Sequence, residues 1–332
     1  MSKVIKRKAF VTGANGFVGS HLVDYLLSNN FEVTCLVRKS ANLQWLKEKD
    51  VNLVNTGFEN KSRLVESLRG MEYVFHVAGV VKAKNRYDYF KGNAGVTKDL
   101  LEACLTTKES IKRIVIVSSE TAAGPSRVAL GSKETDISAP ITSYGISKLA
   151  QERLSLDYQK ELPITIVRPP AVYGERDTEI FIFFNSYNKG VTTTIGFEKK
   201  LISLIHVNDL VRGIFLSAMS ETSVGQTYFI TSNSFYTWEE IIEKTKLAMG
   251  KGALRFKIPH SAVYLIAAAA QFISMFQSKP ATLNLEKARD ITQSYWICSH
   301  EKAKADFGFE TTIDLEEGIH RTINWYRSEN WF

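Results

Sequence analysis

The most informative part of the sequence is a glycine-rich segment, Thr12-Gly13-Ala14-Asn15-Gly16-Phe17-Val18-Gly19-Ser20. An apolar run, Lys8–Thr12, leads into it, and a helical pattern, Ser20–Asn29, follows it. A glycine-rich loop between a strand and a helix is the context in which such a loop binds a dinucleotide. An ordinary glycine-rich turn is the alternative, because the chain has 20 glycines and a single match of this spacing is weak evidence.

The three glycines of this loop have different physical roles. Gly13 permits a tight turn, Gly16 lets backbone N–H groups approach a pyrophosphate, and Gly19 lets the helix pack closely on the strand. The N-terminus of that helix faces the phosphates. We therefore predict that a dinucleotide contacts the loop through Gly13, Asn15, Gly16, Phe17, Val18 and Gly19.

The first half of the chain alternates short apolar runs with helical patterns. The runs predict strands over Lys8–Thr12, Glu32–Val37, Val51–Asn55, Tyr73–Val77, Arg113–Ser118 and Ile164–Arg168. Apolar residues spaced by three and four predict helices over Ser20–Asn29, Ser62–Arg69, Asn93–Cys104 and Tyr144–Leu162. Strands that alternate with helices are parallel and joined by crossovers. The predicted class is α/β, a Rossmann-type doubly wound parallel sheet.

The alternation weakens after about residue 174. Helical patterns remain over Phe181–Tyr187, Glu239–Met249, Ala262–Phe276 and Leu315–Tyr326. We predict a nucleotide-binding Rossmann domain over residues 1–174, to which residues 203–232 return, and a smaller, mixed substrate domain over residues 175–202 and 233–332. Ligands of open α/β sheets bind beyond the carboxyl ends of the strands, so the substrate is expected there.

Composition and charge narrow the class of protein. The 332 residues are 44% hydrophobic and 23% charged, which is typical of a globular chain. The net charge of +7 is dispersed, so a nucleic-acid partner is not expected. Three cysteines far apart in the sequence predict neither a disulfide framework nor a metal site and fit a reducing compartment. The opening residues lack the pattern of a secretory signal, so a cytoplasmic location is expected.

The end of the second strand bears on the choice of dinucleotide. NAD enzymes usually place a carboxylate there for the ribose hydroxyls, whereas this chain has Arg38 and Lys39. A guanidinium can grip a 2′-phosphate with two parallel hydrogen bonds. We therefore predict NADP in preference to NAD, with a merely solvated strand end as the alternative. Phe58, in the loop after the third strand, is expected to contact the adenine face.

A second constellation carries acid–base chemistry. Tyr144 and Lys148 lie four residues apart, which places both side chains on one face of the predicted helix. A nearby ammonium and the charge of an oxidised nicotinamide would lower the phenol pKa from about 10 toward neutrality. Tyr144 would then serve as general acid or base at a carbonyl or alcohol. Chance alone gives one such pair in a chain with 13 tyrosines, but Ser119, at the end of the fifth strand, adds a hydroxyl for the reacting oxygen.

These motifs together resemble the extended short-chain dehydrogenase/reductase family. The resemblance covers essentially the whole chain, and its motifs are Thr12–Gly19, His76–Gly79, Ser118-Ser119, Tyr144–Lys148 and Arg168–Gly174. It implies that Ser119, Tyr144 and Lys148 form a catalytic triad. It also implies a homodimer built on the helices at Asn93–Cys104 and Tyr144–Leu162. The remaining implied residues are Ala78 and Gly79 lining the cofactor, Lys148 on the nicotinamide ribose, Pro169 and Val172 along the nicotinamide, and Asn93 as a support.

Several positions favour one branch of that family. Nucleotide-sugar epimerases usually carry Asn where this chain has Ala171 and Arg where it has Ile202, so two contacts to a diphosphate are missing. Sugar dehydratases carry an Asp-Glu pair where this chain has Glu120-Thr121. The stretches Ser118–Ser126 and Ser299–Glu310 resemble the 3β-hydroxysteroid dehydrogenase branch, while Arg38 is more similar to its dihydroflavonol-reductase-like members.

The sequence therefore predicts an NAD(P)-dependent oxidoreductase. It would move a hydride between the nicotinamide and a secondary alcohol or ketone of a hydrophobic, for example sterol-like, substrate. The first alternative is an NAD-dependent epimerase or dehydratase of nucleotide sugars. The second is a catalytically silent nucleotide-binding regulator, against which the intact Ser119, Tyr144 and Lys148 argue.

The segment Ala262–Phe276 is apolar and uncharged, but at 15 residues it is too short for a membrane span. We expect it to be a buried helix of the second domain. The alternative is a hydrophobic gate or a contact with the membrane surface.

Overall fold

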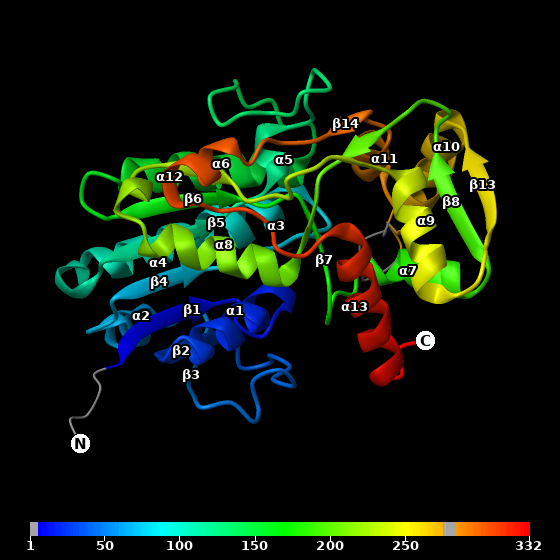
Figure 1. Cartoon of the computed structure of the whole chain (residues 1–332). Coiled ribbons are helices and arrows are strands. Elements are labelled where there is room, and N and C mark those ends of the chain that lie inside the picture. The colour runs from blue at the N-terminus through cyan, green and yellow to red at the C-terminus, as the bar shows by residue number, and fades with distance from the viewer. Residues whose placement is uncertain (1–5, 275, 277–282) are drawn as a thin grey trace.

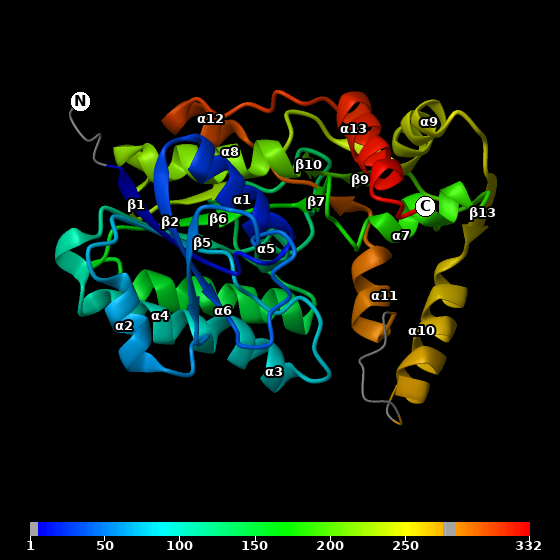
Figure 2. The same ribbon diagram turned by 90° about the horizontal axis from the view of Figure 1, so that it is seen from below.

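The chain was analysed as a computed structural model that describes residues 6–274, 276 and 283–332. A parallel sheet in the order β11-β6-β5-β4-β1-β2-β3 forms its larger part (Figures 1 and 2). Its strands are β1 (Arg7–Thr12), β2 (Phe31–Val37), β3 (Val51–Asn55), β4 (Tyr73–His76), β5 (Arg113–Val117), β6 (Ile164–Arg168) and β11 (Thr227–Phe229). The chain reverses direction across the sheet between β1 and β4, so the predicted doubly wound α/β fold is confirmed.

Helices cover both faces of this sheet (Figure 2). Apolar side chains of α1 and α8 share one buried cluster with β1 and β2, while those of α2 and α4 share another on the opposite face. The helices around the sheet are α1 (Phe17–Ser28), α2 (Lys61–Leu68), α3 (Arg86–Phe90), α4 (Val96–Leu105), α5 (Glu120–Ala123), α6 (Ser143–Asp157), α8 (Val207–Met219) and α12 (Glu301–Phe307). The central strands β4, β5 and β6 are buried along their whole length, which explains their continuous apolar runs, whereas β3 at the edge of the sheet is partly exposed.

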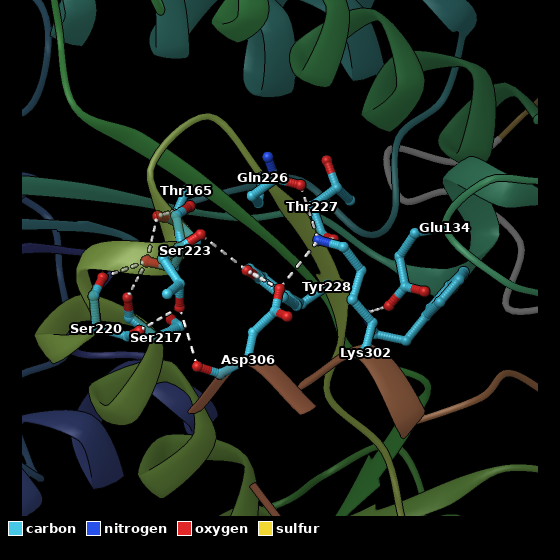
Figure 3. A network of polar contacts seen from close by, with 12 residues as sticks. Glu134, Thr165, Ser217, Ser220, Ser223, Gln226, Thr227, Tyr228, Lys302 and Asp306 are labelled. Atoms are coloured by element: carbon cyan, nitrogen blue, oxygen red, sulfur yellow. Dashed lines mark hydrogen bonds and ion pairs between the residues drawn. The ribbon is translucent and has the colours of Figure 1, made fainter. Parts of the chain in front are cut away.

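The sheet edge at β11 is closed by α12 (Figure 3). Lys302 donates to the backbone oxygen of Thr227 and lies 3.7 Å from the ring centroid of Tyr228, whose hydroxyl donates to Asp306 at 2.7 Å. Within the segment 203–232, β11 lies in the large sheet and α8 packs on it. Residues 301–307, which the sequence places in the second domain, also pack on the large sheet, and the division into two domains stays a prediction.

The second part of the chain surrounds a separate apolar cluster at the right of Figure 1. Its helices are α7 (Phe181–Asn188), α9 (Trp238–Met249), α10 (His260–Ser274), α11 (Leu285–Ile291) and α13 (Leu315–Ser328). Its short strands are β8 (Val191–Ile195), β9 (Leu201–Ile202), β12 (Tyr236–Thr237), β13 (Leu254–Ile258) and β14 (Tyr295–Trp296). Two further strands, β7 (Ala171–Tyr173) and β10 (Leu204–His206), pair where the two parts meet.

The helices differ from their predicted bounds by one to five residues; α1, for example, begins at Phe17 and not at Ser20. The helix predicted over Tyr144–Leu162 ends at Asp157, because turns lead from Tyr158 to Pro163 and the residue before a proline disfavours helical backbone. The helix predicted from Asn93 is preceded by a π-helical turn, Lys91–Gly95. Two 3₁₀ turns, Lys108–Ser110 and Glu221–Ser223, complete the described elements.

The expectation of a buried helix over Ala262–Phe276 is wrong in one respect. The segment is helical over His260–Ser274, while Met275 lies outside the described residues. Within this helix only Val263 and Ala267 are buried, and Leu265 is 73% exposed. The helix is apolar on both its buried and its exposed face, so its apolar composition could not reveal its burial. Among the helices described, none is long and apolar enough to cross a membrane.

Candidate active site

The glycine loop has the backbone that a bound diphosphate requires. Gly13 has φ of +69°, and a Cβ there would lie 2.7 Å from the backbone nitrogen of Ala78. A Cβ at Gly19 would lie 2.1 Å from the Gly13 oxygen, so helix and strand touch. Gly16 is the N-cap of α1, and no side chain caps this helix. The first N–H groups of α1 are therefore available to phosphate oxygens, and the loop fits a dinucleotide. Three further predicted contacts, Asn15, Phe17 and Val18, lie in the same turn and are partly exposed.

The residues predicted at the adenosine end lie beyond β2 and β3. Arg38 directly follows β2 and is exposed, and its Cγ lies 3.5 Å from where a Gly57 Cβ would be. Phe58 is half-buried, packs on the core and meets His76 edge-on at 5.9 Å between ring centroids. Three strand spacings, roughly 14 Å, separate β2 from β5. The site is therefore extended along the sheet edge, as an elongated ligand such as a dinucleotide needs.

The structure brings Ser119, Tyr144 and Lys148 together beyond the carboxyl end of β5. Helix α6 begins at Ser143, and the Thr142 hydroxyl caps it by accepting from the Gly145 N–H at 3.1 Å. Tyr144 and Lys148 are one turn apart on this helix. The Lys148 ammonium donates to the Val117 carbonyl at 2.8 Å, and the Ser119 hydroxyl bonds the Tyr144 phenol. The site thus combines the two hydroxyl groups of Ser119 and Tyr144 with the amino group of Lys148, one helical turn further along α6.

Burial governs the protonation of these groups. It raises the pKa of Tyr144 to about 12, and the Ser119 hydroxyl only partly opposes this rise. It lowers the pKa of Lys148 to about 7, against the pull of the Glu152 carboxylate. In the chain without a nicotinamide, burial therefore outweighs the effect of the nearby lysine on the phenol pKa, and a pKa lowered toward neutrality remains a prediction for the complex with the oxidised coenzyme. Burial prevails because Tyr144 is desolvated and the lysine is itself only partly charged near pH 7.

A buried polar chain connects the glycine-loop strand to α6. The Thr12 hydroxyl and His76 Nδ1 are 2.8 Å apart, and His76 Nε2 and the Thr97 hydroxyl are also 2.8 Å apart. Gln151 of α6 donates to the same Thr97 oxygen at 2.8 Å. Burial lowers the pKa of His76 to about 3, so its ring is neutral and can accept one bond and donate the other. The chain fixes the strand that carries the loop relative to the helix that carries Tyr144.

Asn93 holds three segments at one point. Its amide donates to the Ser147 hydroxyl at 2.8 Å and to the Val80 carbonyl at 3.1 Å, and its oxygen accepts from the Val80 N–H at 2.8 Å. It lies fully buried in the π-helical turn, a feature that often marks functional sites. A Cβ at Gly79 would lie 2.9 Å from this oxygen and 3.6 Å from Lys148 Nζ, so Ala78-Gly79 runs beside the lysine.

A buried ion pair, not foreseen from the sequence, lies one turn beyond Lys148. Glu152 accepts from Arg168 at 2.7 and 2.9 Å and from the Ser118 hydroxyl at 2.5 Å. Spacing of four along α6 places Tyr144, Lys148 and Glu152 on one face, so this spacing was the available signal. Arg168 begins the predicted segment Arg168–Gly174. Pro169, in that segment, accepts from the Glu120 N–H at 2.8 Å, and Val172 in β7 is half-buried.

Glu120 is a buried carboxyl next to Ser119. Burial raises its pKa to about 8, the Cys298 thiol opposes the rise by hydrogen bonding, and Asp290 adds to it. Within the described residues, its Oε1 has no hydrogen-bond partner. The side chain is therefore mostly protonated near neutral pH and is a potential donor. Burial also raises the pKa of the Cys298 thiol well above its usual range, so this cysteine is not a thiolate.

Helix α11 reaches the start of α6 from the far end of the chain. Glu286 accepts from the Ser143 hydroxyl at 2.6 Å and from the Ser143 N–H at 3.0 Å. Tyr89 of α3 lies 6.1 Å from Tyr144 between ring centroids. Asp290 acts electrostatically on Tyr144 from one turn beyond Glu286. No motif in the sequence marks these residues, because their contacts join segments up to 143 positions apart.

Potential metal ligands and surface cavities are two further features of the molecule that bear on the site. The described residues contain no group of three or more His, Cys, Asp or Glu that could hold a metal ion. A surface cavity of about 540 Å³ lies between α1, α8 and α13, and Ser119, Tyr144 and Lys148 are not among its lining residues.

Comparison with known proteins identifies the family. A model of the NAD dependent epimerase/dehydratase family matches residues 9–237. The chain is 26% identical to the ceramide reductase of Caulobacter vibrioides over 97% of this chain and 95% of that protein. It is 24% identical to the decarboxylating sterol-4-alpha-carboxylate 3-dehydrogenase of Mus musculus, over 96% and 90%.

A solved structure shows the same fold. The UDP-glucuronic acid 4-epimerase of Bacillus cereus, in complex with UDP-glucuronic acid and NAD, superposes with a TM-score of 0.77 at 22% identity, over 97% of this chain and 99% of that one. The family model covers more than half of the chain and includes the glycine loop and the segment of Tyr144 and Lys148. The chain therefore belongs to the NAD-dependent epimerase/dehydratase family.

Proposed function

We propose that this protein is an NADP-dependent oxidoreductase that reduces a ketone of a hydrophobic substrate, or oxidises the corresponding secondary alcohol. The observation that carries the proposal is the Ser119, Tyr144 and Lys148 arrangement beside the Ala78-Gly79 segment. The family match supports the general chemistry. The substrate class and the coenzyme are our own extension of it.

The residues divide the chemistry of the reduction. The bound coenzyme supplies the hydride that adds to the carbonyl carbon. Tyr144 gives its phenolic proton to the carbonyl oxygen as the C=O π bond breaks, and the alcohol results. Ser119 donates a hydrogen bond to the same oxygen and positions it. A phenol that keeps its proton near neutral pH is suited to this donation. Lys148, near its own pKa at pH 7, stabilises the tyrosinate that remains.

Arg38 supports NADP as the coenzyme. It is exposed directly after β2, which pairs with β1, the strand before the glycine loop. A guanidinium forms two parallel, charge-assisted hydrogen bonds with a phosphate. Lys39 adds a second exposed cation. In that position both cations attract a 2′-phosphate, and neither accepts a hydrogen bond from a free ribose hydroxyl.

Three observations favour a hydrophobic substrate. Two of the relatives that match over nearly the whole chain are named for a ceramide and for a sterol carboxylate. Ala171 and Ile202, where the family's epimerases usually have Asn and Arg, offer no polar side chain to a diphosphate. The apolar helix α10 packs on α11, which contacts the start of α6. An apolar substrate would therefore have an apolar surface next to the site.

A second candidate is an NAD-dependent epimerase or dehydratase of nucleotide sugars. The family model supports it as directly as it supports a dehydrogenase. The same three side chains could serve it, because its first step also removes a hydride from a CH–OH group. What distinguishes the two is the ligand beside the nicotinamide and the retention of the coenzyme after turnover.

The test is a substrate screen with a matched pair of variants. Purified protein is given NADPH and a panel of long-chain and polycyclic ketones in mild detergent, and loss of reduced nicotinamide absorbance is followed. Tyr144→Phe should lower kcat by about 10²–10⁴-fold, the usual contribution of a general acid, and leave the NADP⁺ dissociation constant nearly unchanged. Tyr87→Phe, at a 71% exposed position, is the control. Full activity in Tyr144→Phe would overturn the assignment.

A further inference from the structure

We infer that α10 and the strand before it form a docking surface for an anionic lipid membrane. The surface comprises β13 and α10, residues 254–274, with Phe276. Figure 2 shows β13 and α10 following one another along the right-hand edge, with α10 beside α11. This inference concerns a partner and does not depend on which reaction the site performs.

The outward face of α10 is apolar where a helix of a water-soluble surface is polar. Leu265, Phe272 and Ile273 are 73%, 63% and 56% exposed. Ala268 and Ala269 lie on the same side, and no residue from 261 to 274 is charged. The narrow buried face, Val263 and Ala267, packs on α11. This is the reverse of an ordinary amphipathic surface helix, whose exposed face carries charge. Such a patch marks an interaction site.

The neighbouring strand extends the patch and adds cations. In β13, Leu254 and Phe256 are 70% and 53% exposed, and they alternate with Arg255 and Lys257. Alternate residues of a strand point to opposite faces, so apolar side chains lie on one face and cations on the other. Arg255 pairs with Glu239 of α9, whereas Lys257 is exposed.

The charge of this segment matches an anionic surface. The described residues between Lys251 and Ile291 include five lysines and arginines and two acids, a net charge of +3. An interfacial helix inserts its apolar face into the headgroup region, while nearby cations bind anionic headgroups. The uncharged apolar face of α10 and the cations close to it in the sequence are therefore the features expected of a surface that binds an anionic membrane.

A second copy of the chain fits the surface less well than lipid does. In a two-fold dimer the same patch faces itself, so the net charge of +3 on its described residues would face an identical charge. A bilayer instead offers apolar chains for the exposed face of α10 and negative headgroups for the cations beside it. We therefore commit to an anionic membrane as the occupant.

The surface is mechanically linked to the candidate active site. Gln271 of α10 accepts from the Leu285 N–H, which begins α11. Glu286, the next residue, accepts two hydrogen bonds from Ser143, directly before Tyr144. A membrane that binds α10 would thus lie one helix away from the start of α6. A ligand dissolved in that membrane would be close to the site.

The experiment measures co-sedimentation of the full chain with vesicles. Vesicles of phosphatidylcholine are compared with vesicles that also contain phosphatidylglycerol, at low and high salt. The double variant Leu265→Glu/Phe272→Glu tests the apolar face. Leu247→Glu, at a 57% exposed position of α9, is the matched control. A second double variant, Lys251→Glu/Lys257→Glu, tests the charge without touching α10. Circular dichroism and NADP⁺ binding verify that each variant is folded.

The expected result is binding of the wild type that strengthens at least about tenfold with phosphatidylglycerol and weakens with salt. Leu265→Glu/Phe272→Glu should lose binding at least about tenfold, Lys251→Glu/Lys257→Glu should lose the lipid-charge dependence, and Leu247→Glu should bind normally. Two results overturn the inference. One is undiminished binding by the α10 variant. The other is a wild-type dimer that does not sediment with vesicles and that the α10 variant converts to monomers in analytical ultracentrifugation.

Discussion

Burial shifts the pKa values of three titratable groups at the candidate site. The phenol of Tyr144, the ammonium of Lys148 and the carboxyl of Glu120 all shift toward their neutral forms. In this dry surrounding one added charge has a large effect, because little solvent screens it. The pKa values of these three groups should therefore shift when a charged ligand binds next to them. Such a shift would favour proton transfer between Tyr144 and a carbonyl oxygen.

Glu120 gives the clearest pH dependence of stability. Its pKa is about 8 in the folded chain against 4.5 as its reference. The folded state therefore holds a proton that the unfolded state has lost between these values, and stability falls as pH rises through that window. We expect Glu120→Gln, a neutral isostere, to remove this loss. Chemical denaturation at about pH 5 and about pH 8 should show the difference, up to about 4 kcal/mol.

The control for that measurement is Glu109→Gln, which removes an exposed carboxylate from a 3₁₀ turn. It should leave the pH dependence of the unfolding free energy unchanged. A Glu120→Gln protein that loses as much stability as the wild type on going from acid to neutral pH would refute the proposed role of this buried carboxyl.

Arg38 determines the coenzyme preference in our account. Arg38→Ser removes a charge-assisted pair of hydrogen bonds, worth about 1.5–3 kcal/mol, and should weaken NADP⁺ binding by about 10- to 100-fold. NAD⁺ binding should change by less than about threefold, since NAD⁺ lacks the 2′-phosphate for that pair. Lys39→Ser is the neighbouring control, with a smaller expected effect. Calorimetric titration of the wild type and both variants gives the six dissociation constants, and equal losses for both coenzymes in Arg38→Ser would contradict the role of Arg38.

Local spacing made part of the site predictable at this scale. Tyr144 and Lys148 follow from a four-residue interval, and Ser119 follows from its place at a strand end. The same interval would have found Glu152. Glu286 and Tyr89 carried no such signal, because only the folded chain brings α11 and α3 to the start of α6. The rise in the pKa of Tyr144 in the unliganded chain had no signal in the sequence, because a sequence shows neighbouring residues but not their desolvation.

At the scale of elements, α6 organises the site. One of its faces carries Tyr144, Lys148 and Glu152, and the buried Glu152–Arg168 pair fixes that helix to β6. The chain of bonds from Thr12 through His76 and Thr97 to Gln151 fixes it to β1. The catalytic helix is thus held from both sides by polar contacts that exclude water.

Removing one partner of the buried pair should be costly. Glu152→Gln leaves the Arg168 guanidinium buried with its charge uncompensated, and we expect a loss of about 3–5 kcal/mol of unfolding free energy. The exposed pair Arg63–Glu66 is the matched comparison, and Glu66→Gln should cost less than about 1 kcal/mol. Urea denaturation of the three proteins measures both. Equal stability of the Glu152 and Glu66 variants would show that the buried pair does not hold α6.

The strands of the large sheet were predictable from short runs rich in apolar and β-branched residues, even at the partly exposed edge strand β3. The apolar runs gave β3 and β6 to the residue and the other predicted sheet strands within one residue at each end. The π-helical turn at Asn93 was not foreseen, because its register depends on contacts with Val80 and Ser147. The expected burial of α10 was wrong because an apolar helix has the same sequence pattern whether the rest of the protein or another partner covers it.

At the scale of the whole molecule, the candidate binding and catalytic residues lie along one edge of the sheet, beyond the carboxyl ends of its strands. Arg38 beyond β2, the glycine loop beyond β1 and Ser119 beyond β5 lie along one edge in the order that a dinucleotide would need. The second part of the chain adds α11 above the start of α6 and α10 beyond it. Topology rules predicted the first arrangement. The second arrangement depends on how the C-terminal segments pack on the sheet, and no repeating pattern in the sequence predicts that packing.

The most direct test of the central claim is calorimetric titration of the protein, stripped of bound nucleotide, with NADP⁺, NAD⁺ and a panel of nucleotide-diphosphate sugars. Our account expects NADP⁺ to bind at least about tenfold more tightly than NAD⁺, a difference of about 1.4 kcal/mol, with no binding heat from the sugars. NAD⁺ that resists stripping, together with a nucleotide sugar that binds, would contradict it. The protein would then be an epimerase or dehydratase of nucleotide sugars.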